Sequence, residues 1–151
     1  MNLNAVRSLL KKQDKRPILQ CIHYLNNQMI VTDGYSLIIE TQSVNIATPI
    51  TIDVNTGKFP LGTYPDISKI IPQEHELYPV TSMAIKETSD GAFYYINDHK
   101  FNKEQVNKSF ACFDIKKPME KINAIKVKEK SPLFVYQENN YYILVLGLRK
   151  D

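Results

Sequence analysis

The sequence has 151 residues, of which 43% are hydrophobic and 23% are charged, a balance typical of globular proteins. It contains no apolar run of the roughly 20 residues that a membrane-spanning helix needs, and its first residues lack the apolar core of a secretory signal. We therefore expect one cytoplasmic domain with no membrane partner, and the net charge of +3 permits an acidic partner without requiring one.

The residues that carry chemistry in enzymes are scattered. The three histidines are far apart and the five glycines are not clustered, which excludes the usual metal-ligand spacings, a P-loop and a dinucleotide fingerprint. Cys21 and Cys112 each lie in an apolar stretch, so we expect two buried free thiols. These patterns predict a protein that is not an enzyme and that uses no metal or cofactor.

The first expected element is an amphipathic helix over residues 3–15. Leu3, Val6, Leu9 and Leu10 recur at helical spacing, and Pro17 ends the helix because the residue before a proline avoids the helical region. Arg7, Lys11 and Lys15 form a basic row at i, i+4 spacing on another face of this helix, with Lys12 beside them.

Strands are expected next, over residues 17–24, 29–31, 37–39 and 50–54. Asn26-Asn27 is interpreted as a turn, and Asp33-Gly34 is a strong hairpin signal, because a type I′ turn needs positive φ at both central positions. Residues 59–79 contain four prolines, which predicts an ordered surface connector with one short helical turn over 66–71.

Residues 80–151 repeat the plan of the first part. Strands are expected over 82–86, 92–96, 124–128, 133–137 and 141–148, and a second helix over 101–113. Asn102 is the expected cap of that helix, with Gln105 in the capping-box position. The sequence thus predicts an α+β fold in which two helices pack on antiparallel sheet, with a first unit (1–58), a connector (59–79) and a second unit (80–151) in one domain.

Three segments resemble the bacterial β sliding clamp, the β subunit of DNA polymerase III. Residues 16–19 (RPIL) and 31–37 (VTDGYSL) are similar to the family's "RPIL … ATDGHRL", residues 63–72 (TYPDISKIIP) to "FPDYRRVLP", and residues 142–149 (YILVLGLR) to "YVVMPMRL". The chain departs from the family at Tyr35, Ser36 and Gly147, which replace His, Arg and Pro. It has room for one clamp domain, whereas the family has three.

The resemblance implies a groove that binds short peptides of DNA polymerases and other clamp clients. Carried over position by position, the groove would comprise Leu19, Thr32, Gly34, Tyr35, Ser36, Leu37, Pro65, Lys69, Ile70, Leu144 and Leu146. Its apolar walls would take leucine or phenylalanine anchors of an extended peptide, with polar residues at the rim. The alternative is that the apolar members are ordinary core residues.

The resemblance also implies that the helices face double-stranded DNA through non-specific phosphate contacts. The DNA-facing residues would be Arg7, Lys11, Lys12, Lys15, Lys103 and Lys108. A ring of one-domain chains would require a homo-oligomer of about six copies joined at sheet edges.

The function expected from these features is that of a sliding-clamp-like processivity factor in DNA replication. Two alternatives remain open. One is a monomeric or dimeric clamp-like adaptor or decoy that binds client peptides without encircling DNA. The other is a generic nucleic-acid-binding module that uses only the basic first helix, whose charges could equally be an ordinary solvated face.

Overall fold

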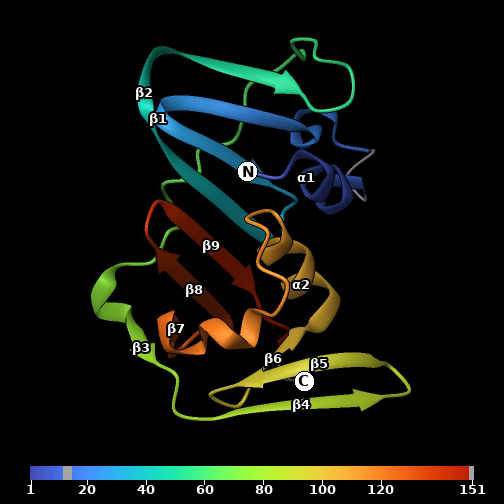
Figure 1. Ribbon diagram of the computed structural model, residues 1–151, viewed down its shortest axis with the longest axis vertical. Coiled ribbons are helices and arrows are strands. Elements are labelled where there is room, and N and C mark those ends of the chain that lie inside the picture. Colours follow the sequence, from blue (N-terminus) through green and yellow to red (C-terminus); the bar gives the residue numbers. More distant parts are fainter. Residues whose placement is uncertain (12–14, 150–151) are drawn as a thin grey trace.

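The computed structural model describes residues 1–11 and 15–149, and in these residues two antiparallel sheets are accompanied by two α-helices and three short 3₁₀ helices (Figure 1). The larger sheet contains β1 (Cys21–Thr32), β2 (Ser36–Asp53), β9 (Tyr141–Leu146), β8 (Leu133–Glu138), β7 (Ile125–Lys128) and β3 (Leu77–Pro79), in that spatial order. The smaller sheet contains β4 (Met83–Thr88), β5 (Gly91–Ile96) and β6 (His99–Asn102). The helices are α1 (Leu3–Leu10), α2 (Lys103–Ala111), η2 (Pro17–Gln20), η3 (Glu74–Glu76) and η4 (Pro118–Ala124).

The central strands of the larger sheet are buried on both faces. Two hydrophobic clusters lie on the two faces of the sheet. Along β2, Ile38 belongs to the first cluster, under α1 and α2, whereas its neighbours Leu37 and Ile39 belong to the second cluster. The same alternation divides Ile143 from Leu144 on β9. Because neither face is exposed, these strands read as continuous apolar runs in the sequence.

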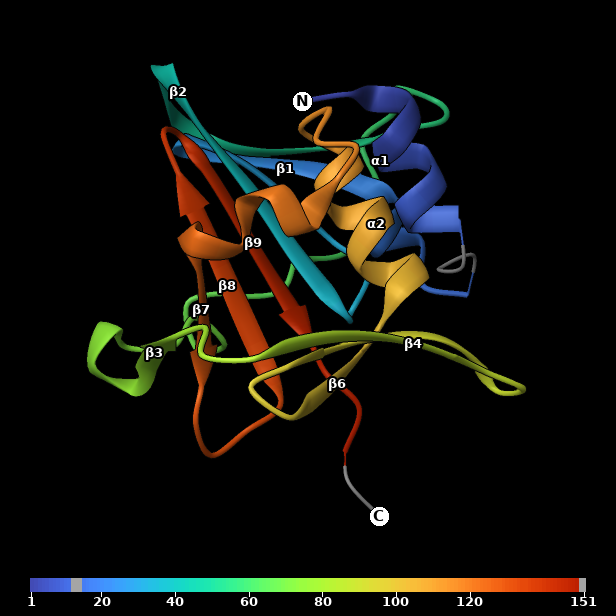
Figure 2. The same cartoon turned by 60° about the horizontal axis from the view of Figure 1, so that its bottom comes forward.

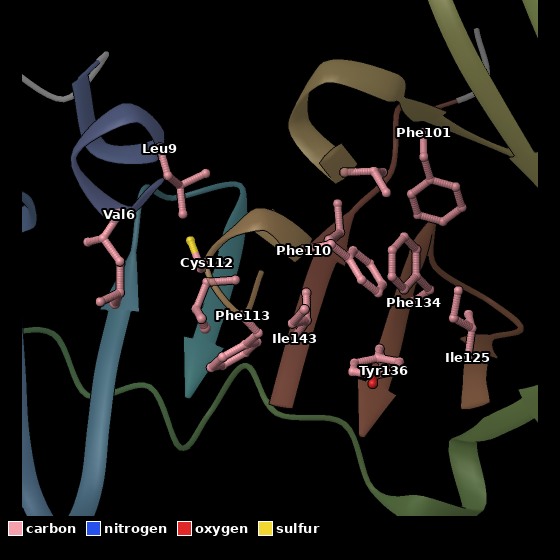
Figure 3. Packing of buried hydrophobic residues seen from close by; sticks show 14 of the residues in the cluster. Val6, Leu9, Phe101, Phe110, Cys112, Phe113, Ile125, Phe134, Tyr136 and Ile143 are labelled. Carbon is pink, nitrogen blue, oxygen red and sulfur yellow. The ribbon is translucent and has the colours of Figure 1, made fainter. Parts of the chain in front are cut away.

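Helices α1 and α2 lie side by side over one face of the larger sheet (Figures 1 and 2). Aromatic rings fill the space beneath α2, where the ring centroids of Phe110 and Tyr136 are 5.1 Å apart and those of Phe101 and Phe134 are 5.0 Å apart (Figure 3). Phe101, Phe110 and Phe134 are fully buried. This cluster fixes the position of α2 on the sheet.

The connector covers the opposite face of the larger sheet. Its Tyr64 is buried against the second cluster and stacks on His23, with ring centroids 4.5 Å apart. Three partly buried connector residues pack on the same cluster: Ile67, Ile71 and Leu77. The connector is mostly exposed, but it also closes the core on one side. It ends in η3 and β3, which the prediction of a single helical turn at 66–71 did not include.

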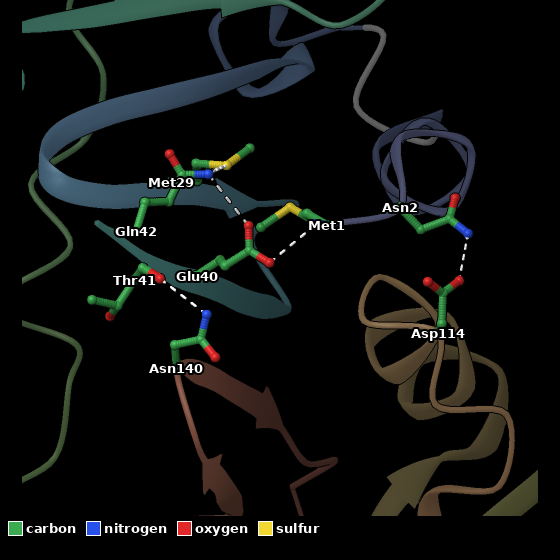
Figure 4. A network of polar contacts seen from close by, with 8 residues as sticks. All are labelled: Met1, Asn2, Met29, Glu40, Thr41, Gln42, Asp114 and Asn140. Carbon is green, nitrogen blue, oxygen red and sulfur yellow. Dashed lines mark hydrogen bonds and ion pairs between the residues drawn. The ribbon is translucent and has the colours of Figure 1, made fainter. Parts of the chain in front are cut away.

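Side-chain hydrogen bonds join parts of the chain that are far apart in sequence (Figure 4). Asn2 Nδ2 donates to Asp114 Oδ1 at 2.7 Å, which ties the start of α1 to the segment after α2. Asn140 Nδ2 donates to the carbonyl oxygen of Thr41 at 3.1 Å, which ties the β8–β9 turn to β2.

The region after α1 differs from the prediction. The helix ends at Leu10, whose carbonyl oxygen accepts a hydrogen bond from Gln20 Nε2 at 2.8 Å, and Lys15 lies in a turn. Residues 17–20 form η2 and not a strand, because Pro17 is pre-set for the first position of a helical turn. The strand expected from residue 17 begins only at Cys21.

The first hairpin is longer and simpler than predicted. β1 runs through Asn26-Asn27 without a turn; Asn26 has a φ of +54°, and the pairing with β2 shifts register on both sides of it. The strands expected at 37–39 and 50–54 are two ends of the single strand β2. An irregularity in the ladder therefore takes the place of the predicted turn.

The second part follows the prediction more closely. The strands near 82–86, 92–96, 124–128, 133–137 and 141–148 are confirmed as β4, β5, β7, β8 and β9. Asn102 caps α2 by accepting a hydrogen bond from Gln105 N at 2.9 Å, but the capping box is wrong, because the Gln105 side chain bonds elsewhere. Strand β6 occupies the expected start of that helix.

The connector contains one turn at the expected place, 66–71, where the backbone nitrogen of Ile70 donates to the carbonyl oxygen of Ile67.

Candidate functional site

A cavity of about 280 Å³ opens where the connector meets the turn between β1 and β2. It is lined by Arg16, Leu19, Thr32, Gly34, Tyr35, Ser36, Leu37, Pro65, Asp66, Ile67, Ile70, Leu144 and Leu146, and we call it the groove. Ten of the eleven residues expected to form a groove are among these thirteen; the exception is Lys69, which does not line the cavity. Arg16, Asp66 and Ile67 were missed, although each lies in one of the segments that carry the family resemblance.

The groove has a buried floor and an exposed rim. Leu19, Leu37 and Leu144 are at most 4% exposed and contribute to the core, so the interpretation of these three as core residues is correct. Ile70 and Leu146 are 51% and 43% exposed and stand at the rim. An apolar floor with an accessible apolar rim suits the insertion of aliphatic or aromatic side chains from an extended segment.

The turn between β1 and β2 forms one wall of the groove. Asp33 Oδ1 accepts hydrogen bonds from the backbone nitrogens of Tyr35 and Ser36, at 2.9 and 2.8 Å. Gly34 has a φ of +91°, and a Cβ atom there would lie 2.8 Å from Arg16 Nη2. The predicted type I′ turn is therefore wrong, because within the Asp-Gly pair only the glycine has positive φ; the turn instead holds the exposed Tyr35 beside the groove.

Helix α2 supports this turn from the other face of the sheet. Gln105 Nε2 donates to Asp33 Oδ2 and to Ser36 Oγ, both at 2.8 Å. Ser36 Oγ is also 2.6 Å from Ser109 Oγ, and Ser109 donates to the carbonyl oxygen of Gln105. Asp33, Ser36 and Ser109 are all buried, so this network fixes the turn in one conformation.

The charge at the rim is mixed. Hydrogen bonds from the Ser68 hydroxyl and backbone nitrogen hold the pKa of the exposed Asp66 carboxyl below its usual value, so Asp66 is ionised at neutral pH. Arg16 also lines the groove. Within the described residues no group of three His, Cys, Asp or Glu side chains could hold a metal ion, and no described helix is long and apolar enough to cross a membrane.

The predicted DNA-facing residues of the first helix are only partly brought together. Lys11 and Lys15 are exposed, with Lys11 at the end of α1 and Lys15 beyond it in the turn. Arg7 is exposed, but its Nε donates to the carbonyl oxygen of Val54 at 3.0 Å. Lys12 lies outside the described residues. A basic row along a helix of thirteen residues is therefore wrong, because α1 is shorter.

The predicted DNA-facing residues of the second helix are partly buried. Lys108 Nζ lies 2.9 Å from Glu104 Oε1, and the ammonium group of Lys103 lies 5.9 Å from the centre of the Tyr94 ring. Both lysines are thus engaged within the chain, which leaves α1 and the following turn as the more accessible basic surface.

The arrangement of the sheets and helices matches a known structure. The chain is similar to the crystal structure of DNA polymerase III, beta chain, from Streptococcus pneumoniae TIGR4, with a TM-score of 0.62 and 12% sequence identity. The protein has a β-clamp-like fold. The match covers 99% of this chain and 64% of that chain, and its low identity establishes the clamp-like fold alone. No protein-family model and no curated protein matches the sequence.

Proposed function

We propose that this protein is a sliding-clamp-like DNA replication processivity factor that binds client peptides in the groove and has no catalytic activity of its own. The proposal is carried by the convergence of predicted residues from four separate segments (19, 32–37, 65–70 and 144–146) on one cavity. The clamp-like fold supports it, because in this fold those segments line one cavity.

The groove would bind an extended peptide through apolar anchors. One leucine that becomes fully buried contributes about 1.5–3 kcal/mol, which is roughly 10- to 100-fold in the dissociation constant. Leu146 and Ile70 are two aliphatic rim residues that would gain burial, since both are exposed in the free protein.

Fluorescence anisotropy with a labelled peptide that carries leucine and phenylalanine anchors tests this proposal. Leu146→Asp places a charge at the rim, and we expect at least tenfold weaker binding. The control is Ile85→Asp, at a half-exposed position on β4 outside the groove, which should bind as the wild type does. Equal affinity of the wild type and Leu146→Asp would exclude the groove as the binding site.

We also propose that copies of this chain assemble into a ring around DNA. The edge strands of the larger sheet, β1 and β3, would join neighbouring copies, and Lys11 and Lys15 would contact phosphates. Light scattering with and without duplex DNA measures the assembly, and a strictly monomeric protein in both conditions would overturn the ring. Peptide binding by such a monomer would favour the adaptor or decoy.

A Lys11→Glu/Lys15→Glu variant tests the phosphate contacts. It should weaken salt-dependent DNA binding if α1 and its following turn face the phosphates. Unchanged DNA binding by this variant would exclude both the ring orientation proposed here and the generic module that uses the basic helix.

A further inference from the structure

A loop that follows β2 presents two large apolar side chains to solvent. This loop, residues 58–63 (KFPLGT), is called the Phe59 loop. Phe59 is 76% exposed and Leu61 is 97% exposed, more than any other large hydrophobic residue that the structure describes. Single exposed apolar residues are common on protein surfaces, but a pair on one short loop is a feature of interaction sites.

The entry into the Phe59 loop is fixed by hydrogen bonds. The backbone nitrogen of Asp53 donates to the carbonyl oxygen of Lys58 at 2.9 Å, and the nitrogen of Gly57 donates back to the carbonyl oxygen of Asp53. Lys58 N also donates to Thr56 Oγ1 at 3.2 Å. A loop whose entry is fixed before it binds loses less conformational entropy on association, which favours the presentation of anchors.

We propose that the Phe59 loop of one copy occupies the groove of a second copy. The inference rests on the proposed function, because it assumes that the groove accepts apolar anchors. Phe59 and Leu61 are two residues apart and therefore share a side of an extended chain, which suits a groove with an apolar floor. The loop carries one charge, that of Lys58, which can pair with the Asp66 carboxylate at the groove rim, while Arg16 lines the same groove.

The loop cannot easily enter the groove of its own chain. Leu61 precedes Pro65, a wall residue of the groove, by four residues, and Tyr64 lies between them. Tyr64 is buried and stacked on His23, so the chain is anchored to the core at this point and Leu61 extends into solvent. A second copy is therefore the occupant to which the geometry points.

This contact would regulate the groove. One loop and one groove per copy give a heterologous contact, which builds chains or closed rings of copies. A client peptide could bind only by displacing the Phe59 loop of the neighbouring copy. The proposed peptide-binding site would then be closed by self-association at high protein concentration and opened by clients.

The direct test is anisotropy with a fluorescein-labelled peptide of residues 56–64 (TGKFPLGTY), titrated with the full chain. We expect binding by the wild type, and roughly 10- to 100-fold weaker binding when Leu61 in the peptide is replaced by serine. Ile70→Asp in the full chain should weaken binding at least tenfold, whereas Val44→Ser, at an exposed position on β2 outside the groove, should not. Far-UV circular dichroism establishes that each variant is folded.

Comparison with the client-type peptide separates the two proposals. A chain that binds the client-type peptide but not the 56–64 peptide overturns this inference and leaves the proposed function intact. A chain that binds neither overturns both. Binding of the 56–64 peptide that is unchanged by Ile70→Asp also overturns the inference, because the peptide would then bind outside the groove.

A mixing experiment with the full chain completes the test. Phe59→Ser/Leu61→Ser lacks the anchors, and Ile70→Asp lacks the groove, so each alone should associate at least tenfold more weakly than the wild type in analytical ultracentrifugation. An equimolar mixture should form a heterodimer, since one intact loop meets one intact groove. The proposal is contradicted if either variant alone self-associates as strongly as the wild type. It is also contradicted if the mixture of the two variants does not associate.

Discussion

Replacement of Gln105 by alanine should loosen the turn that walls the groove and destabilise the protein. The Gln105 amide donates to Asp33 Oδ2 and Ser36 Oγ, and Asp33 is only 4% exposed. A hydrogen bond to a charged group contributes about 1.5–3 kcal/mol, and a neutral one about 1 kcal/mol. Because water reaches the site only in part, we expect a loss of about 2–3 kcal/mol in the free energy of unfolding. For a chain of this size that corresponds to a fall in Tm of roughly 4–12 °C.

Urea unfolding at neutral pH, followed by circular dichroism, measures this loss. The matched control is Glu104→Ala on the same helix, which removes an exposed ion pair to Lys108 with a separation of 2.9 Å. Such a pair contributes about 0.5 kcal/mol or less. If Gln105→Ala and Glu104→Ala unfold at the same urea concentration, the network does not stabilise the turn and the reasoning is refuted.

Three further predictions concern buried groups and the turn. Burial raises the pKa of the Cys21 thiol to about 11 and that of Cys112 to about 12, so both should resist a disulfide reagent at about pH 8 until urea unfolds the chain, and fast labelling of the native protein would contradict this. Burial lowers the pKa of His23 below its usual value near 6.5, so the unfolded chain binds the proton more readily than the folded chain. Tm should therefore fall as the pH drops below about 6.5. This fall should be smaller in His23→Gln than in the control variant His75→Gln. Gly34→Ala should cost about 1–2 kcal/mol in urea unfolding, because alanine is strained at φ +91°, and a neutral result would refute a required positive φ.

Most strands of the larger sheet were predictable because their apolar content is local, whereas β3, in the proline-rich connector, was not predicted. Val31 and Leu37 flank an Asp-Gly pair, and the runs at 133–137 and 141–146 are too short and too apolar to be surface helices. The groove was predictable in part for another reason. Its residues lie in segments that resemble a known family, and the clamp-like fold brings those segments together.

Other features depend on partners that are distant in sequence. Gln105 fits a capping box by spacing, but its amide bonds Asp33, 72 residues away, which spacing alone cannot reveal. Residues 17–20 have the composition of a strand, yet they form η2 between α1 and β1. Asn26-Asn27 has the composition of a turn, but the neighbouring strand keeps it in the ladder as an irregularity.

The sequence by itself determined the class of fold and the chain reversal at Asp33-Gly34, because these follow from periodicity and local composition, and it indicated the groove only through a family resemblance. The tertiary structure alone decided where α1 ends, how long β2 runs and which polar groups hold the groove turn. It also decided that Leu61 lies in solvent while Tyr64, three residues later, is buried. These features depend on hydrogen-bond and packing partners that are distant in sequence. The free energy of burying a residue is set by the packing around it and not by its identity alone.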